Sequence, residues 1–180
     1  MALWRIRATV DDRPGFLALL AASLALKSVN ILSVQVHTTE AGAVDEFLVE
    51  APEELTPADL VEAVRRGRGR EPWLCRAEAR GLVDEPTRML GLATRVAADP
   101  AQLDSALQSL LGDCEIIWRG HPATGREGYT AHAMVLADPT GGSLLVHRFE
   151  PSFTPAEYAR AHALVRLVAV VQAQIHGSNL

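Results

Sequence analysis

The sequence predicts an α+β protein with two domains, one over residues 1–82 and one over residues 83–180. Two observations predict this class. Segments with apolar residues at every second position, typical of strands, are mixed with segments in which apolar residues recur every three or four positions, typical of helices. Clusters of Gly, Pro and Asp separate these segments. The 180 residues are 48% apolar, which is enough to build two small cores.

The first half contains four strand-like and two helix-like segments. The strands are expected at residues 3–10, 31–38, 44–51 and 72–79, with a turn at Glu40–Gly42 joining the middle pair. The helices are expected at residues 14–27, ended by Asn30 in a left-handed turn, and at residues 57–66, opened by Thr56 and Pro57. This β-α-β-β-α-β order predicts a ferredoxin-like sandwich, in which both helices lie on one face of a four-stranded antiparallel sheet.

The second half has a different order of elements. Residues 81–86 are expected to form a linker, because Asp84, Glu85 and Pro86 interrupt regular structure. Two helices, three strands and a last helix opened by Thr154 and Pro155 follow. The helices are expected at residues 87–97, 100–111 and 155–175, and the strands at 114–118, 130–137 and 143–149, with a loop at 120–128 and a hairpin turn at 138–142. We therefore expect a three-stranded antiparallel sheet packed against helices.

The composition and the apolar stretches argue against a nucleic-acid-binding, a secreted or a membrane-spanning protein. The formal net charge is −5, whereas a nucleic-acid-binding protein normally presents a basic face. The N-terminus lacks the pattern of a secretory signal, and the apolar stretches 16–26 and 164–171 are shorter than the roughly 20 residues that span a bilayer. Cys75 and Cys114 are expected to be buried free thiols, although a disulfide between them stays open. We expect a cytoplasmic protein with no nucleic-acid or membrane partner.

The turn between the first strand and the first helix carries the most chemistry. It reads Asp11-Asp12-Arg13-Pro14-Gly15-Phe16-Leu17. A helix N-terminus offers N–H donors and a partial positive charge for a carboxylate, and Gly15 leaves room for a ligand to approach the backbone. Asp12 could accept hydrogen bonds from an ammonium group. Together these groups suit a ligand that carries both charges, such as a free amino acid.

This turn, followed fifteen residues after Gly15 by Asn30-Ile31, resembles the ACT domain. The resemblance covers residues 3–80 and includes the order of the elements. It implies a regulatory module that binds an amino acid at the interface of a homodimer, with Asp12 and Gly15 from one subunit and Asn30 from its neighbour. Phe16 and Ile31 would line the apolar part. The sequence departs from the family at Ser28, where many members have glycine. The expected ligand-binding residues are Asp12, Arg13, Gly15, Phe16, Asn30 and Ile31.

Each of these residues also has a purely structural interpretation. Asp12 could cap the first helix, Gly15 could permit close packing of helix on sheet, and Asn30 could end the helix. The basic run formed by Arg65, Arg66, Arg68 and Arg70 could contact an acidic partner or a phosphate, but a solvated helix C-terminus explains it more simply.

The second half contains no motif for a nucleotide, a metal or a catalytic nucleophile. His132 and His147 lie on adjacent expected strands and could face one pocket. Residues 133–171 weakly resemble the end of a GAF-type sensor domain. We expect a non-catalytic sensor of a small molecule, most simply an amino acid, that needs no cofactor. The alternatives are a small transferase-like enzyme with its site in residues 84–180 and a partner-docking protein whose ACT-like site is empty.

Overall fold

The computed structural model describes residues 1–39, 42–77, 85–121 and 127–177. The chain divides into two compact units, Met1–Leu82 and Val83–Leu180, which we call unit 1 and unit 2. The expected turn at Glu40–Gly42 and the expected linker lie mostly outside the described residues.

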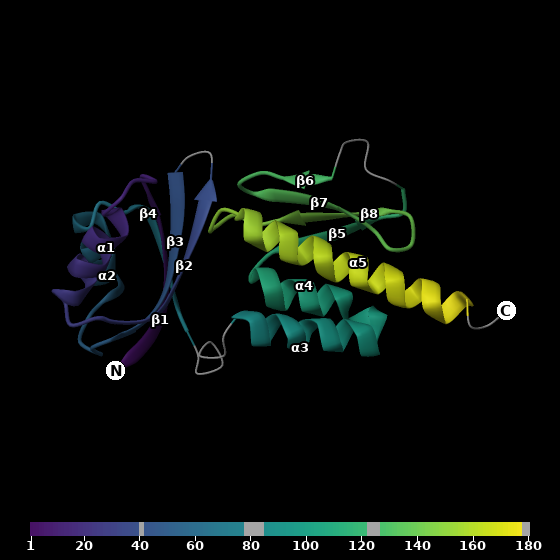
Figure 1. The fold of residues 1–180 in the computed structure, drawn as a ribbon, viewed down its shortest axis with the longest axis horizontal. Helices are drawn as coiled ribbons and strands as arrows, with labels where there is room; N and C mark the ends of the chain where they lie inside the picture. Colours follow the sequence, from purple (N-terminus) through teal and green to yellow (C-terminus); the bar gives the residue numbers. More distant parts are fainter. Residues whose placement is uncertain (40–41, 78–84, 122–126, 178–180) are drawn as a thin grey trace. The chain divides into compact units, whose positions relative to one another are not determined.

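Unit 1 has the ferredoxin-like fold that the sequence predicts. Its strands form one antiparallel sheet in the order β2-β3-β1-β4, and α1 and α2 lie side by side on one face of it (Figure 1). The elements are β1 (Ala2–Val10), α1 (Phe16–Ala25), β2 (Asn30–Thr39), β3 (Gly42–Ala51), α2 (Pro57–Arg66) and β4 (Arg70–Arg76).

The core of unit 1 follows from the alternation of its two central strands. Every second residue of β1 and β3 points toward the helices, and the buried members include Ile6, Phe47 and Val49. Leu20 of α1 and Leu60 of α2 complete the cluster. One inward position of β3 is not apolar: it holds the carboxylate of Asp45.

Local signals set the helix ends of unit 1. Thr56 and Asp59 form a capping box at the start of α2, with Pro57 as the first helical residue, as the sequence predicts. The prediction that Asn30 ends the first helix in a left-handed turn is wrong. Ser28 adopts that conformation, with φ of 58°, and Asn30 is already the first residue of β2. The glycine that many ACT domains have at this position is therefore the residue best suited to its backbone.

Unit 2 places helices against a second antiparallel sheet. The strand order is β5-β8-β7-β6, so the described residues of unit 2 form a four-stranded sheet and the predicted three-stranded sheet is wrong. The missed strand, β6, has only two residues and no periodicity that a sequence could show. The elements are α3 (Glu85–Ala98), η2 (Pro100–Gln102), α4 (Leu103–Leu111), β5 (Glu115–Arg119), β6 (Gly128–Tyr129), β7 (Ala133–Ala137), β8 (Ser143–His147) and α5 (Pro155–Gly177).

Three helix starts in unit 2 contain proline, and the sequence predicts two of them, at Pro100 and at Pro155. Thr154 and Glu157 form the predicted capping box before α5, each side chain accepting a hydrogen bond from the other residue's backbone N–H. Glu85 and Pro86 were expected to break regular structure, but they begin α3. Proline is tolerated in a first helical turn because no intrahelical acceptor is needed there.

The core of unit 2 is formed by all three long helices and the sheet. Met134, Leu136, Leu144 and Val146 project from β7 and β8 against the helices, where Leu107 of α4 is fully buried with them. None of the described helices combines the length and apolar character that crossing a bilayer requires. Both cysteines are free and half-buried.

Candidate functional site

The turn after β1 leaves the first helix uncapped. Gly15 is the N-cap residue of α1 and is left-handed, with φ of 92°, and among the described residues no side chain accepts from the helix's first turn. The structural interpretation of Asp12 as the cap is therefore wrong. The N–H of Phe16 donates to the carbonyl oxygen of Arg13 at 3.3 Å, and no described side chain accepts from the N–H groups of Leu17 and Ala18.

The backbone conformation at position 15 requires glycine, whereas packing does not. A Cβ atom built on Gly15 would meet no heavy atom within 4 Å, so the residue borders open space. Its positive φ is the conformation that glycine adopts most easily. The sharp turn and the open space together expose the start of α1 next to Asp12, whose side chain is exposed.

The charged residues around this turn fall into two groups. Asp11 accepts a hydrogen bond from Arg70 at 2.6 Å, and this contact holds the pKa of the Asp11 carboxyl below its usual value. Arg68 lies over the ring of Phe16, at 5.9 Å from its centroid. By contrast, Asp12 and Arg13 are exposed and form no ion pair with another described residue. Part of the basic run thus stabilises unit 1 itself, and the carboxylate of Asp12 is left to solvent.

Asp45 is a further carboxylate near this turn, and the sequence interpretation missed it. It is 1% exposed, and its Oδ2 has no hydrogen-bond partner among the described residues. It is paired with Ala8 in the sheet, one inward position from Val10, where the turn begins. Burial raises the pKa of Asp45, and the negative charge of Asp12 raises it further. In the alternating pattern of this strand, Asp45 occupies a position whose side chain points inward. That position was the sequence signal that could have identified it.

Asn30 and Ile31 lie at the other end of the sheet from this turn. Asn30 pairs with Glu50, and Glu50 pairs with Leu3, near the start of β1. The turn follows Val10, seven residues farther along the strand. At about 3.3 Å per residue, Asn30 is roughly 23 Å from the turn along the strand direction. Within one chain the structure therefore brings Asp12, Arg13, Gly15 and Phe16 together, and separates them from Asn30 and Ile31.

Strand β2 is an edge strand with unusual composition. Its ten residues carry no Asp, Glu, Lys or Arg, and Leu32, Val34 and Val36 are 41%, 41% and 50% exposed. The opposite edge, β4, is shorter and begins and ends with arginine. Exposed edge strands are templates for pairing with another chain, and charges such as those of β4 oppose such pairing. Leu17 and Leu19 of α1 are also exposed, and they extend the apolar character of this side of unit 1.

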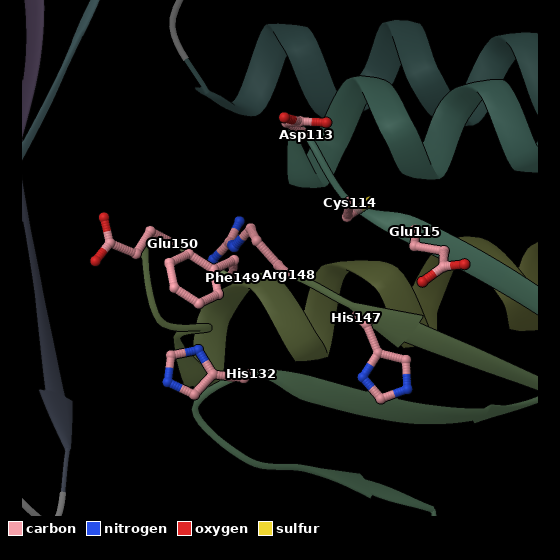
Figure 2. Close-up of a pocket in the computed structure, with 8 residues that line it drawn as sticks. All are labelled: Asp113, Cys114, Glu115, His132, His147, Arg148, Phe149 and Glu150. Carbon is pink, nitrogen blue, oxygen red and sulfur yellow. The ribbon is translucent and has the colours of Figure 1, made fainter.

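A separate pocket of about 900 Å³ lies within unit 2, where β5 begins and β8 ends (Figure 2). Both His132 and His147 line it, as the sequence allows, although His132 precedes β7 and does not lie on a strand. We call it the unit 2 pocket; its lining residues are Asp113, Cys114, Glu115, His132, His147, Arg148, Phe149 and Glu150.

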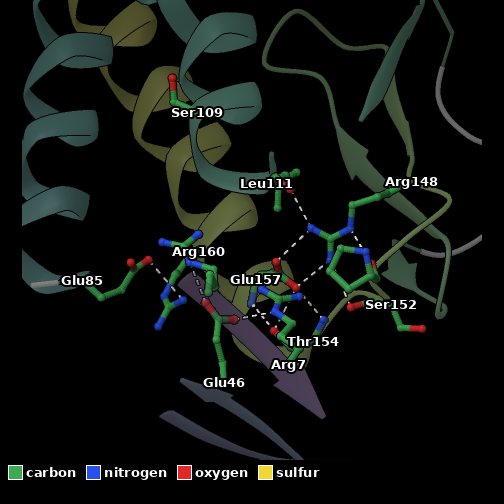
Figure 3. Close-up of polar contacts among 12 residues, drawn as sticks. Arg7, Glu46, Glu85, Ser109, Leu111, Arg148, Ser152, Thr154, Glu157 and Arg160 are labelled. Atoms are coloured by element: carbon green, nitrogen blue, oxygen red, sulfur yellow. Dashed lines mark hydrogen bonds and ion pairs between the residues drawn. The ribbon is translucent and has the colours of Figure 1, made fainter. Parts of the chain in front are cut away.

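Arg148, the one arginine of this lining, is held entirely by the protein (Figure 3). Its guanidinium donates to the carbonyl oxygens of Leu111, Pro151 and Ser152 at 2.6, 2.6 and 3.1 Å, and to both carboxylate oxygens of Glu157 at 3.0 Å each. These contacts use all five of its N–H donors. Arg148 therefore fixes the loop that follows β8 and has no donor left for a ligand.

Two findings concern the reactive groups of the unit 2 pocket. Burial raises the pKa of the Cys114 thiol, which disfavours the nucleophilic thiolate. Within the described part of the chain, no group of three or more His, Cys, Asp or Glu residues is arranged to hold a metal ion.

Comparison with known proteins gives only distant likenesses. No protein-family model matches the sequence, and no curated protein matches it. Among solved structures, the chain is similar to an unknown protein from Galdieria sulphuraria, with 14% identity, a TM-score of 0.41 and coverage of 96% of this chain and 92% of that chain. It is also similar to the regulatory subunits of aspartate kinase from two bacteria. The ligand-free subunit from Thermus thermophilus has 18% identity and a TM-score of 0.35, and the match covers 94% of this chain and 93% of that chain. The subunit from Thermus flavus has 17% identity and a TM-score of 0.34, and the match covers 96% of this chain and 94% of that chain. The fold assignment rests on the strand order of unit 1 and not on these scores.

Proposed function

We propose that this chain is a non-catalytic regulatory protein of the cytoplasm that binds a free amino acid at an ACT-type homodimer interface. The observation that carries the proposal is the uncapped N-terminus of α1 beside the unpaired carboxylate of Asp12. The N–H groups of Leu17 and Ala18 in the first turn of α1 would bind the α-carboxylate, and Asp12 would accept from the α-ammonium. Phe16 supplies an apolar wall next to both groups.

The second half of the site would come from a partner chain. If two copies of β2 pair antiparallel about a two-fold axis, the strand of the partner runs in the opposite direction. A pairing centred on β2 sets the partner's Asn30 opposite Thr39, at the end of the sheet where the turn lies. The absence of Asp, Glu, Lys and Arg from β2 removes like-charge repulsion from such self-pairing. The same pairing would bring Asn30 and Ile31 toward the Asp12 turn of the other chain.

Ligand-induced stabilisation tests the proposal. The full chain should be screened against the twenty amino acids by thermal unfolding, because a ligand at 100 times its Kd stabilises by about 2.7 kcal/mol. Asp12→Ala and Asn30→Ala should each abolish the shift, whereas Glu54→Ala, an exposed carboxylate elsewhere in unit 1, should leave it intact. If no amino acid stabilises the protein, the proposal is wrong.

A mixing experiment tests whether the site is shared between chains. In a heterodimer of Asp12→Ala and Asn30→Ala chains, one site carries both substitutions and the other carries neither. Mixing the two inactive variants should therefore restore binding at up to one site per heterodimer. Continued absence of binding, with heterodimers present by native mass spectrometry, would show that Asp12 and Asn30 do not act in one composite site.

A further inference from the structure

We propose that the unit 2 pocket is a second ligand site, and that it binds a small organic cation of the aliphatic diamine class. This inference is independent of the amino-acid site proposed in unit 1. A pocket of about 900 Å³ falls within the range of roughly 300–1,000 Å³ that is usual for small-molecule sites. The charge of its lining and the arrangement of the lining residues specify the ligand class.

The charge of the lining is negative. Asp113, Glu115 and Glu150 are exposed and form no ion pair with a described cation. The positive charge of Arg148 is balanced by Glu157, and its five donors are already used. An anionic ligand would therefore meet three carboxylates and no free guanidinium, whereas a cation would meet acceptors only.

The arrangement of these groups favours a ligand with a charge at each end. Figure 2 shows Glu150 at one side of the pocket and Glu115 at the other, with the ring of Phe149 between them in this view. Phe149 is 90% exposed, so its ring is open to a ligand. An aromatic face attracts an ammonium group and also packs against the methylene chain that joins two such groups.

The histidine rings add acceptors and a means of observation. Glu115 and His147 are direct partners in the β5–β8 ladder, so their side chains leave the same face of the sheet. When neutral, each imidazole of His132 and His147 has one nitrogen that accepts a hydrogen bond from an ammonium group. Since both rings line the pocket, their resonances report on its occupancy.

The backbone on the Arg148 side of the pocket is held in place by hydrogen bonds. The backbone N–H of Arg148 donates to the carbonyl of His132 at 3.1 Å, and its side chain joins the end of α4 to the loop after β8. The Arg148 guanidinium also lies over the ring of Phe153, at 4.1 Å from the centroid. The backbone next to Arg148 therefore needs little ordering on binding, which favours affinity for small ligands.

The test is a titration of the full chain with 1,4-diaminobutane, followed by calorimetry and by the histidine ring signals in NMR spectra. The diamine should shift the signals of His132 and His147 but not that of His37 in unit 1, and should bind more tightly than 1-butylamine. Neither 1,4-butanediol nor succinate should bind. Binding of succinate, or no shift with the diamine at millimolar concentration, would overturn the proposal.

Variants separate a defined site from diffuse attraction to an acidic protein. Glu115→Gln, Glu150→Gln and Phe149→Leu should each raise the Kd by about two- to fivefold, as expected for single exposed ion-pair or cation–π contacts. The matched control is Glu54→Gln, which removes an equal charge from unit 1 and should leave the Kd unchanged. Because all three substituted side chains are exposed, the variants should have the same Tm as the wild type. Equal weakening by Glu54→Gln would overturn the proposal.

Discussion

Replacing Asp45 with asparagine should stabilise the protein, and by an amount that increases with pH. The Asp45 carboxyl is buried on the inner face of β3 with an unpaired Oδ2, and its pKa is raised by that burial and by the charge of Asp12. The folded chain therefore holds this proton to a higher pH than the unfolded chain. The stability linked to that proton is complete below the unfolded pKa and is lost as the pH rises through the folded pKa.

The magnitude follows from the linkage between the pKa and the stability. Each unit of difference between the folded and unfolded pKa is worth about 1.4 kcal/mol once the group is ionised. Because an amide is also polar, the substitution removes only the cost of ionising the buried carboxyl. Since the asparagine side chain is neutral at every pH, Asp45→Asn should gain stability of this order in alkaline solution and little in acid. For a unit of this size, each kcal/mol raises Tm by about 4–8 °C.

The assay is thermal unfolding of the full chain from about pH 5 to about pH 9, with hydrogen exchange of β3 amides as a readout confined to unit 1. Asp113→Asn is the matched control, because it makes the same chemical change at an exposed site in unit 2. Its difference from wild type should be small and nearly independent of pH. An Asp45→Asn difference that is equally flat, or that becomes destabilising as the pH rises, would refute the reasoning, because either result means that the ionised carboxylate is well solvated or paired.

Two further predictions test packing and the buried ion pair. Gly67→Ala should lower the free energy of unfolding in urea by about 1–3 kcal/mol, because the new Cβ would lie 2.6 Å from Cα of Leu20. The control is Gly91→Ala, which adds a methyl group in open space within α3 and should stabilise the protein by about 0.5–1 kcal/mol. If both glycine variants behave alike, close packing is not the reason for Gly67. Glu157→Gln should destabilise by about 3–5 kcal/mol, because it leaves the buried charge of Arg148 unbalanced; a loss below about 1 kcal/mol would mean that the pair is effectively solvated.

The features predicted best from the sequence are those determined by neighbouring residues. Both capping boxes involve residues three positions apart, Thr56 with Asp59 and Thr154 with Glu157, and both are present in the structure. The order of elements in unit 1 follows from periodicity, which is also local. The N-cap of α1 is an exception. Gly15 occupies it and no side chain accepts a hydrogen bond there, although Asp12 lies only three residues earlier.

The features that sequence could not supply depend on contacts between distant segments. β6 exists only because Gly128 and Tyr129 meet β7, and the shift of register near Leu32 depends on how β2 meets β3. The saturation of Arg148 likewise depends on carbonyls from the end of α4 and from the loop after β8. Asp45 is an intermediate case, since alternation predicts its inward side chain but not the absence of a partner.

Because Asn30 is far from the turn within one chain, the proposed amino-acid binding by unit 1 requires its dimerisation. A monomer keeps the Asp12 turn but has Asn30 at the opposite end of its sheet, so it holds only half of the proposed site. Val36→Lys places a charge in the middle of the exposed edge, where it should oppose self-pairing. The variant should be monomeric by light scattering and should lose amino-acid stabilisation, although it substitutes none of the proposed ligand contacts. Leu90→Lys, at an exposed position of α3, is the control and should leave both properties unchanged. A monomeric Val36→Lys protein that still binds with wild-type affinity would mean that one chain holds the complete site and that Asn30 is no part of it.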